Sequence, residues 1–208
     1  MTWVTRPLRA EDAFSAARIH EEGQPDTFLT NLGRPFLCAL YRLMATAPQC
    51  EGYIAEQDGE VVGVIVGTAD TRALFRQLIW HSGRQLLPSV LRAILRHPSL
   101  LAKVLQTVRY SEHVGAGPGE AEVLFIGVAR EWRRQGIGHS LLWTLADAYK
   151  TQGIRALGLT VDESNETAKR FYRRNGMRPI HAFRMYGRAM AWYRLPLDAL
   201  ANQGGKAS

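Results

Sequence analysis

The sequence predicts an α/β protein in which helices flank a mixed β-sheet. An alternating apolar segment with Asp58 and Gly59 at its centre predicts an antiparallel hairpin, because both residues tolerate the positive φ angles of a tight turn. Between residues 120 and 161 an apolar strand, a glycine turn, an apolar helix and a second strand follow one another. A basic segment of helical period, residues 71–118, lies between these two units, and we interpret it as a helical insertion.

The composition is typical of a globular protein and argues against a disordered or membrane-spanning one. The 208 residues are 46% hydrophobic and 22% charged, which fits one domain over residues 1–200 with a flexible tail at 201–208. No stretch approaches the roughly 18 uncharged apolar residues of a membrane span, and the first residues lack a secretory signal, so we expect a cytoplasmic protein. Cys38 and Cys50 lack the spacing of a metal site and are expected to be reduced, buried thiols.

The first 70 residues predict one strand, two helices and the hairpin. Residues 2–9 are expected to form the first strand, and residues 10–23 a helix whose acidic first turn favours the positive end of the helix dipole. A further helix begins near Pro35, because apolar residues return to one face at helical spacing. These apolar residues are Phe36, Leu37, Leu40, Tyr41 and Met44. The hairpin follows over residues 51–70.

The net charge of the chain is concentrated in the insertion. No acidic residue occurs between Asp70 and Glu112, whereas seven basic residues do, and the whole chain has a net charge of +7. These basic residues are Arg72, Arg76, Arg84, Arg92, Arg96, Lys103 and Arg109. Apolar positions between residues 86 and 108 recur at helical spacing, so we expect amphipathic helices that could lie on an anionic membrane or bind an acidic partner. Nucleic acid is not an expected partner, because no aromatic-basic recognition pattern accompanies the charge.

The C-terminal part predicts three further strands and two helices. Residues 120–129 have the apolar run of a central strand, and residues 156–161 form the next strand. Asn165 caps a helix that stops at residues 175–177, and residues 189–197 form the last strand. The helix between the first two of these strands has its apolar face at Ile137, Leu141, Leu145 and Ala148.

The turn RRQGIG, residues 133–138, joins the central strand to the helix behind it. A strand that turns at glycines into a helix directs several unpaired N–H groups and the positive end of the helix dipole to one point, which suits a phosphate group. A P-loop is excluded, because it needs a lysine after its second glycine and Gly138 is followed by His139 and Ser140. A dinucleotide fingerprint remains a minor alternative: Gly136 and Gly138 have its spacing, but its third position is a leucine where close packing requires glycine or alanine.

Arg133, Gly136 and Gly138 match the pattern Q/R-x-x-G-x-G, and residues 120–180 continue with helix, strand and an asparagine-capped helix. In these features the sequence resembles the GNAT N-acetyltransferase superfamily, which uses this turn to bind the pyrophosphate of acetyl-CoA. The resemblance implies a mostly antiparallel mixed sheet of about seven strands, splayed at its two central strands. It also implies acetyl-CoA as co-substrate and no metal. Residues 71–118 have no counterpart in the minimal fold of the family.

The resemblance also assigns candidate cofactor residues. It places the pantetheine arm of acetyl-CoA beside Ile126 and Val128, with a backbone N–H at Val128 facing the oxyanion of the tetrahedral intermediate. Asn165 resembles the asparagine that contacts this arm, although its role as a helix cap alone would explain it. Tyr172 matches the tyrosine that protonates the departing thiolate, next to the cofactor. The residues expected around the phosphates are Arg130, Arg133, Arg134, Gln135, Gly136, Ile137, Gly138, His139 and Ser140.

Two glutamates are candidates for the general base that deprotonates the amine. Because strand side chains alternate, Glu120 and Glu122 are expected on one face of the strand, the face that also carries Ile126 and Val128, and Glu122 is favoured. By resemblance, the acceptor site lies opposite the cofactor and is built from the first helices and the C-terminal strands. Polar candidates for this site are His20, Asp26, Asn31, His181 and Tyr186.

These features predict an enzyme that transfers an acetyl group from acetyl-CoA to the primary amine of a small molecule, by direct attack in a ternary complex. Peptide or protein N-termini and lysines are an alternative class of acceptor. A non-catalytic acyl-CoA-binding module, or a module that binds a membrane or an acidic partner, is the alternative of another class. The sequence leaves open whether the protein is a homodimer.

Overall fold

The computed structural model describes residues 2–78, 80, 95, 116–185 and 187–198. They form a seven-stranded sheet with the strand order β1-β2-β3-β4-β5-β7-β6. Every neighbouring pair is antiparallel except β4 and β5, which are parallel, so the mixed, mostly antiparallel sheet is confirmed. The strands are β1 (Val4–Pro7), β2 (Cys50–Gln57), β3 (Glu60–Thr68), β4 (Glu120–Val128), β5 (Ala156–Asp162), β6 (Arg178–Met185) and β7 (Arg188–Pro196).

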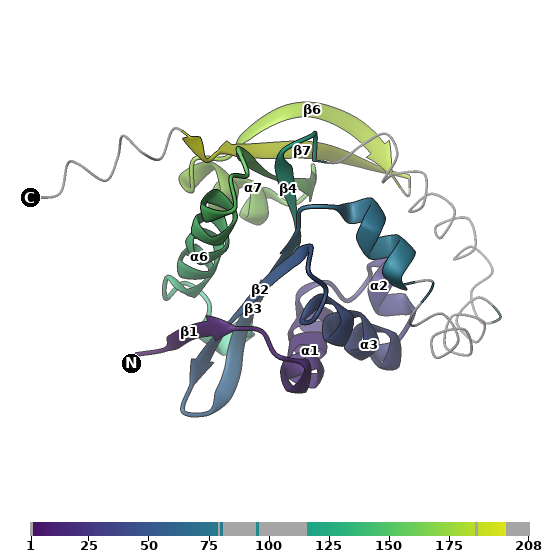
Figure 1. Ribbon diagram of the computed structural model, residues 1–208, viewed down its shortest axis with the longest axis vertical. Helices are drawn as coiled ribbons and strands as arrows, with labels where there is room; N and C mark the ends of the chain where they lie inside the picture. The colour runs from purple at the N-terminus through teal and green to yellow at the C-terminus, as the bar shows by residue number, and fades with distance from the viewer. Residues whose placement is uncertain (1, 79, 81–94, 96–115, 186, 199–208) are drawn as a thin grey trace, which may run out of the picture.

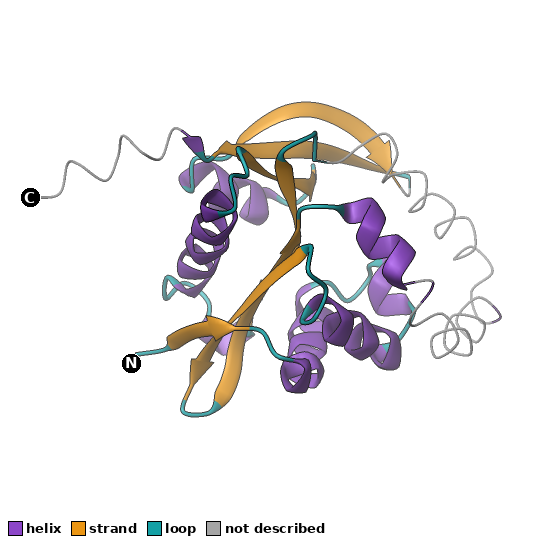
Figure 2. Ribbon diagram, in the orientation of Figure 1, coloured by secondary structure: helices purple, strands orange, loops and turns teal. Residues whose placement is uncertain are grey.

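Helices cover both faces of the sheet (Figures 1 and 2). Helices α1 (Ala13–Gly23) and α3 (Arg34–Met44) pack on one face, which we call the α1 face. Helices α6 (Ile137–Thr151) and α7 (Glu166–Arg174) pack on the other, the α6 face. The shorter elements are α2 (Phe28–Asn31) and the 3₁₀ turns η1 (Ala10–Asp12) and η2 (Arg130–Trp132).

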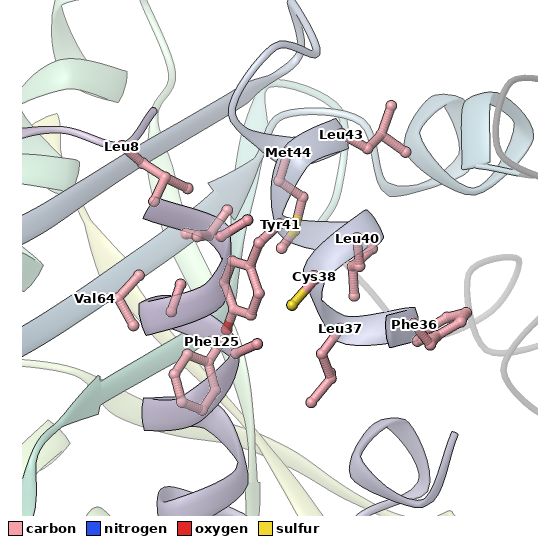
Figure 3. Packing of buried hydrophobic residues seen from close by; sticks show 14 of the residues in the cluster. Leu8, Phe36, Leu37, Cys38, Leu40, Tyr41, Leu43, Met44, Val64 and Phe125 are labelled. Atoms are coloured by element: carbon pink, nitrogen blue, oxygen red, sulfur yellow. The ribbon is translucent and has the colours of Figure 1, made fainter. Parts of the chain in front are cut away.

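Each face has its own apolar core. On the α1 face, Leu37 and Tyr41 of α3 are fully buried in a cluster that includes Phe125 of β4 (Figure 3). On the α6 face, Leu141 and Leu145 of α6 are fully buried against the sheet. Complete burial of each such side chain stabilises the fold by about 1.5–3 kcal/mol. The packing therefore fixes α6, and with it the glycine turn, relative to β4.

Several local predictions are confirmed. β2 and β3 are joined by a two-residue turn in which Asp58 and Gly59 have φ angles of 51° and 83°. Pro35 lies in the first turn of α3. Asn165 caps α7, because its side-chain oxygen accepts a hydrogen bond from the N–H of Ala168 over 3.0 Å.

Two elements differ from what the sequence predicts. The short helix α2 is not anticipated, and the C-terminal segment forms a hairpin of β6 and β7 where one strand was expected over residues 189–197. β6 is mostly exposed and lies at the edge of the sheet. Its sequence therefore lacks the alternation of buried apolar and exposed polar residues that predicts a strand.

The segment that the sequence analysis interprets as an insertion begins with a helix at residues 71–78. Leu74 and Leu78 bury this helix in the core of the α1 face. The predicted apolar positions between residues 86 and 108 lie outside the described residues, apart from Leu95, and so does the tail at 201–208. Within the described ranges, no helix is long and apolar enough to cross a bilayer.

Candidate active site

The two central strands separate in the middle of the sheet. β4 and β5 pair only at their beginnings, and Glu122 opposite Gly158 is their last pair. Beyond this point β4 continues to pair with β3 as far as Val128, while β5 continues to pair with β7 as far as Asp162. The predicted splay is thus present, and we call the point where it starts, at Glu122 and Gly158, the vertex.

A β-bulge at Leu124 changes the face on which side chains of β4 lie. Val66 of β3 pairs with Phe125 and the next residue, Gly67, pairs with Val123, which leaves Leu124 without a partner on β3. Leu124 and Phe125 both contact the core of the α1 face. Since strand side chains otherwise alternate, the extra residue inverts the alternation between the two halves of β4.

The expectation that the two glutamates share a face with Ile126 and Val128 is therefore wrong. Ile126 and Val128 pack on the α6 face, as do Ala121 and Val123. Glu122 lies between Ala121 and Val123 in the strand and so points to the α1 face, as does Glu120. The glutamates and the expected cofactor residues thus lie on opposite faces of the splayed sheet.

The two glutamates have different surroundings. Oε1 of Glu120 accepts a hydrogen bond from Nε of Arg194 over 2.8 Å, and Oε2 accepts one from the N–H of Gly117 over 3.3 Å. Glu122 is 5% exposed, and its Oε2 accepts a hydrogen bond from the hydroxyl of Thr71 over 2.8 Å. The ion pair with Arg194 gives Glu120 a structural role, whereas Glu122 lies at the vertex, where β4 and β5 separate.

The glycine turn starts α6 in the way that phosphate binding requires. Gly136 is the N-cap residue, and its φ of 89° lies in the left-handed region that favours glycine. Gly136 has no side chain to cap the helix, and among the described residues no side chain accepts a hydrogen bond from the first N–H groups of α6. A Cβ atom on Gly138 would lie 3.4 Å from the ring of Phe171, an ordinary contact distance, so α7 packs beside the start of α6.

The polar side chains around the turn have distinct partners. Nε of Arg133 donates to the carbonyl oxygen of Val128 over 2.9 Å and closes the end of β4. Nε2 of Gln135 donates to the carbonyl of Glu131 over 3.4 Å. Arg130, Arg134 and His139 are exposed beside the turn, and Ser140 is half-buried in the first turn of α6.

Asn175 is a contributor to this region that the sequence does not reveal. Its Oδ1 lies 2.6 Å from Nδ1 of His139 and accepts a hydrogen bond from Nε1 of Trp143 over 3.2 Å. Asn175 also ends α7, as expected from its position before Gly176. The sequence indicates only that Asn175 ends α7. Its hydrogen bonds to His139 and Trp143 form because folding places α6 beside it.

Tyr172 lies on α7 and packs on the α6 face, where its ring centroid is 6.3 Å from that of Tyr193. Burial raises the pKa of the Tyr172 phenol above its usual range, so the hydroxyl carries its proton at neutral pH. Within the described part of the chain its hydroxyl makes no hydrogen bond. Tyr172 and Glu122 are therefore placed on opposite faces of the sheet, with the splay of β4 and β5 between them.

The polar acceptor candidates that the structure describes differ in exposure. His20 is 2% exposed, its Nδ1 lies 2.9 Å from the hydroxyl of Tyr41, and its ring stacks on Phe125 at 4.2 Å between centroids. Burial lowers the pKa of His20 to about 4. The remaining candidates Asp26, Asn31 and His181 are exposed, and Tyr186 lies outside the described residues.

Trp192 of β7 is a second residue that the sequence does not reveal. It is 3% exposed and lies on the α1 face, since its neighbours Ala191 and Tyr193 pack on the α6 face. A Cβ atom on Gly158 would overlap its indole ring. A glycine inside a strand is the sequence signal of such a close approach, but it does not name the partner. The indole therefore covers Gly158, at the vertex and next to Glu122.

Comparison with known proteins agrees with this geometry. Residues 16–177 match the family described as the acetyltransferase (GNAT) family. A GNAT-family protein from Desulfovibrio desulfuricans is 18% identical with a TM-score of 0.63, over 94% of this chain and 99% of that chain. The ribosomal-protein-S18-alanine N-acetyltransferase of Escherichia coli is 17% identical with a TM-score of 0.54, over 94% of both chains. NAA60 of Arabidopsis thaliana, solved with acetyl-CoA, is 16% identical with a TM-score of 0.61, over 95% of this chain and 99% of that chain.

The splayed sheet and the glycine turn define the fold of an acetyltransferase. Because the matched family region covers most of the sequence, the chain belongs to the GNAT acetyltransferase family, whose members use acetyl-CoA. At these levels of identity the solved structures show the fold alone. Comparison with curated proteins gives no match.

Proposed function

We propose that this protein is an N-acetyltransferase that moves the acetyl group of acetyl-CoA to the primary amine of a small molecule, by direct attack in a ternary complex. One observation carries the proposal. β4 and β5 part at Glu122, and the other end of β4 leads into a helix whose first N–H groups are uncapped. A carboxylate and a turn that is suited to phosphate thus lie at the two ends of one opening in the sheet.

The residues of this opening fit acetyl-CoA. The uncapped N–H groups at Ile137 and Gly138 suit the pyrophosphate, with Arg134 exposed beside them. Ile126 and Val128 lie on the half of β4 beyond its last pair with β5, which suits the backbone groups of Ile126 to the amide groups of the pantetheine arm. The carbonyl oxygen of Val128 accepts a hydrogen bond from Arg133, which leaves its N–H for the thioester. When bound there, acetyl-CoA supplies the activated acetyl thioester.

The reaction needs a base on one side of the thioester and an acid on the other. Glu122 takes the proton of the amine, directly or through a water, as the N–C bond forms. The C–S bond then breaks, and the neutral phenol of Tyr172 provides the proton for the thiolate. The backbone N–H at Val128 stabilises the oxyanion between these steps. The placement of Glu122 and Tyr172 on opposite faces of the splay supports this division of roles.

The acceptor class is inferred from the vertex. Glu122 is 5% exposed and Trp192 is 3% exposed, which favours an amine on a slim, unbranched carbon chain over a bulky one. A peptide N-terminus or a lysine is the second candidate, since one protein with this fold is named for alanine acetylation of a ribosomal protein. An acyl-CoA-binding module without activity is the candidate of another class.

Isothermal titration of acetyl-CoA, desulfo-CoA and NAD tests the cofactor. We expect the wild type to bind acetyl-CoA and desulfo-CoA but not NAD. Gly136→Trp should abolish this binding, whereas Gly136→Ala, which carries the same penalty for positive φ without the bulk, should weaken it only partly. Binding of NAD alone would establish the dinucleotide alternative and remove the catalytic assignments.

A panel of amines then tests the acceptor. Polyamines, amino sugars and amino acids represent small molecules, and two peptides offer a free N-terminus or a single lysine. Acetylation of a small amine at a rate well above that of both peptides is the expected result. Faster acetylation of a peptide would favour the second candidate, a peptide or protein acceptor. Binding of acetyl-CoA without transfer to any amine would favour the non-catalytic module.

Sedimentation with anionic vesicles at low salt tests the membrane role of the insertion separately.

A further inference from the structure

The carboxylate at the vertex is bonded to the first residue of the insertion. The hydroxyl of Thr71 donates to Oε2 of Glu122 over 2.8 Å, across 51 positions of sequence. Glu122 is nearly completely buried, and a hydrogen bond to a buried charged group is among the stronger polar interactions in a protein. The contact therefore constrains the side chain that the proposed reaction uses as its base.

Thr71 is itself held in place by the helix that it begins. Oδ1 of Asp70 accepts a hydrogen bond from the N–H of Ala73 over 2.8 Å and caps the 71–78 helix. Leu74 and Leu78 bury the helix in the core of the α1 face. Nε2 of Gln49 donates to Oε1 of Gln77 over 3.0 Å and joins the helix to the start of β2. The Thr71 hydroxyl is thus part of a packed element rather than of a mobile surface side chain.

The end of β3 completes this frame. Thr68, the last residue of β3, pairs directly with Glu122 in the sheet. Its hydroxyl accepts a hydrogen bond from the N–H of Asp70 over 3.2 Å, and the N–H of Ala69 donates to the carbonyl of Gln49 over 2.8 Å. The chain between the strand pair and Thr71 is therefore bonded at successive residues. These backbone bonds therefore hold the Thr71 side chain close to the Glu122 side chain.

We infer that Thr71 is a positioning residue of the active site, whose hydroxyl fixes the orientation of the Glu122 carboxylate at the vertex. Thr71 acts through Glu122, so this inference rests on the proposed function. The first residue of the insertion then contacts the proposed catalytic base directly.

The test compares Thr71→Val with Thr71→Ser. Valine has the shape of threonine without the hydroxyl, and serine keeps the hydroxyl. With acetyl-CoA and the primary amine that the wild type acetylates fastest, Thr71→Val should lower kcat about tenfold or more. KM for acetyl-CoA should stay within about twofold, since the cofactor residues lie on the other face. Thr71→Ser should restore most of the lost kcat.

A control distinguishes the loss of the Thr71 hydroxyl from a general loosening of the 71–78 helix. Gln77→Ala removes the bond to Gln49 and leaves Thr71 intact, so kcat should be unchanged even if the melting temperature falls. Equal kcat values for the valine and serine variants, or a loss in Gln77→Ala as large as in Thr71→Val, would overturn the inference while the wild type still acetylates the amine. A wild type that binds acetyl-CoA and acetylates no amine would overturn the proposed function, and this inference with it.

Discussion

Asn175 and His139 join the end of α7 to the first turn of α6, with Oδ1 and Nδ1 2.6 Å apart. Because the amide oxygen only accepts hydrogen bonds, the proton of this bond belongs to Nδ1 of His139. The same oxygen accepts from Trp143, and Nδ2 of Asn175 donates to the carbonyl of Phe171 over 2.8 Å. The glycine turn, whose N–H groups are proposed to bind phosphate, is thus braced from the far end of another helix.

Removing this brace should weaken both the fold and the cofactor site. Asn175→Ala leaves the donors of His139 and Trp143 without their acceptor, so we expect the free energy of unfolding to fall by about 1–3 kcal/mol and acetyl-CoA binding to weaken. Urea unfolding and titration calorimetry measure the two effects. Asp70→Ala is the matched control, because it removes a cap at the start of the 71–78 helix, costs about 1 kcal/mol and does not touch His139 or the proposed cofactor residues. If this control lowers affinity as much as Asn175→Ala, the brace has no specific role in binding.

Gly158 and Trp192 predict a steric effect at the vertex. Gly158→Ala forces a methyl group into the indole ring, and overpacking of this kind costs about 1–3 kcal/mol. We expect a lower melting temperature and a lower rate of acetyl transfer, since β4 and β5 pair at this residue. In the double variant with Trp192→Leu, the penalty of the alanine should largely disappear. A penalty that stays the same without the indole would show that Trp192 is not its cause.

The two glutamates should differ in their effect on catalysis. Glu122→Gln removes the proposed base, so acetylation should slow, most strongly at low pH where the amine is most protonated. Glu120→Gln disturbs an ion pair with Arg194 and should leave the shape of the pH–rate profile unchanged. Steady-state rates of both variants across the pH range measure this difference. A Glu122→Gln profile parallel to that of the wild type would rule out Glu122 as the base.

The phenol of Tyr172 should matter for catalysis and little for stability. Burial raises its pKa, so it remains a proton donor even in mildly alkaline solution. We expect Tyr172→Phe to lower kcat about a hundredfold, at the low end of the range for general acid catalysis, with little change in acetyl-CoA affinity. Tyr193→Phe, which alters the neighbouring ring, serves as the control and should retain its rate. Similar losses in both variants would point to packing as the cause.

His20 should make the stability of the protein fall in acid. Its pKa is lowered by burial to about 4, against an ordinary value near 6.5, so below pH 6.5 the unfolded chain binds a proton that the folded chain does not. The folded state therefore loses up to about 3 kcal/mol as pH falls from about 6.5 to about 4. Urea unfolding of the wild type and of His20→Gln over this pH range isolates the contribution of His20 to the free energy of unfolding. Parallel curves for the two proteins would show that His20 does not titrate in this way.

The elements that the sequence predicts correctly depend on contacts within a few residues. Asp58 and Gly59 have positive φ because a two-residue turn needs it, and Gly136 can adopt a φ of 89° between β4 and α6 because it has no Cβ atom. The apolar face of α6 is visible because its period of 3.6 residues is independent of what it packs against. These local constraints were sufficient for the fold class and for the resemblance to the GNAT family.

The face of Glu122 could not be predicted, because a bulge depends on the partner strand. Nothing in the sequence of β4 marks Leu124 as the residue that β3 leaves unpaired, and one extra residue inverts the alternation. β6 was missed for a related reason, since an exposed edge strand is defined by its pairing with β7 rather than by its own pattern.

By itself, then, the sequence predicted the order of all the longer elements except β6, the glycine turn and the candidates Glu122 and Tyr172. Only the tertiary structure decided which face each candidate occupies and which side chains hold it, as Thr71 holds Glu122 and Asn175 holds His139. These contacts join residues 51 and 36 positions apart, and no periodicity or local propensity acts over such separations. They exist because burial of apolar side chains on both faces of the sheet brings the helices and strands together.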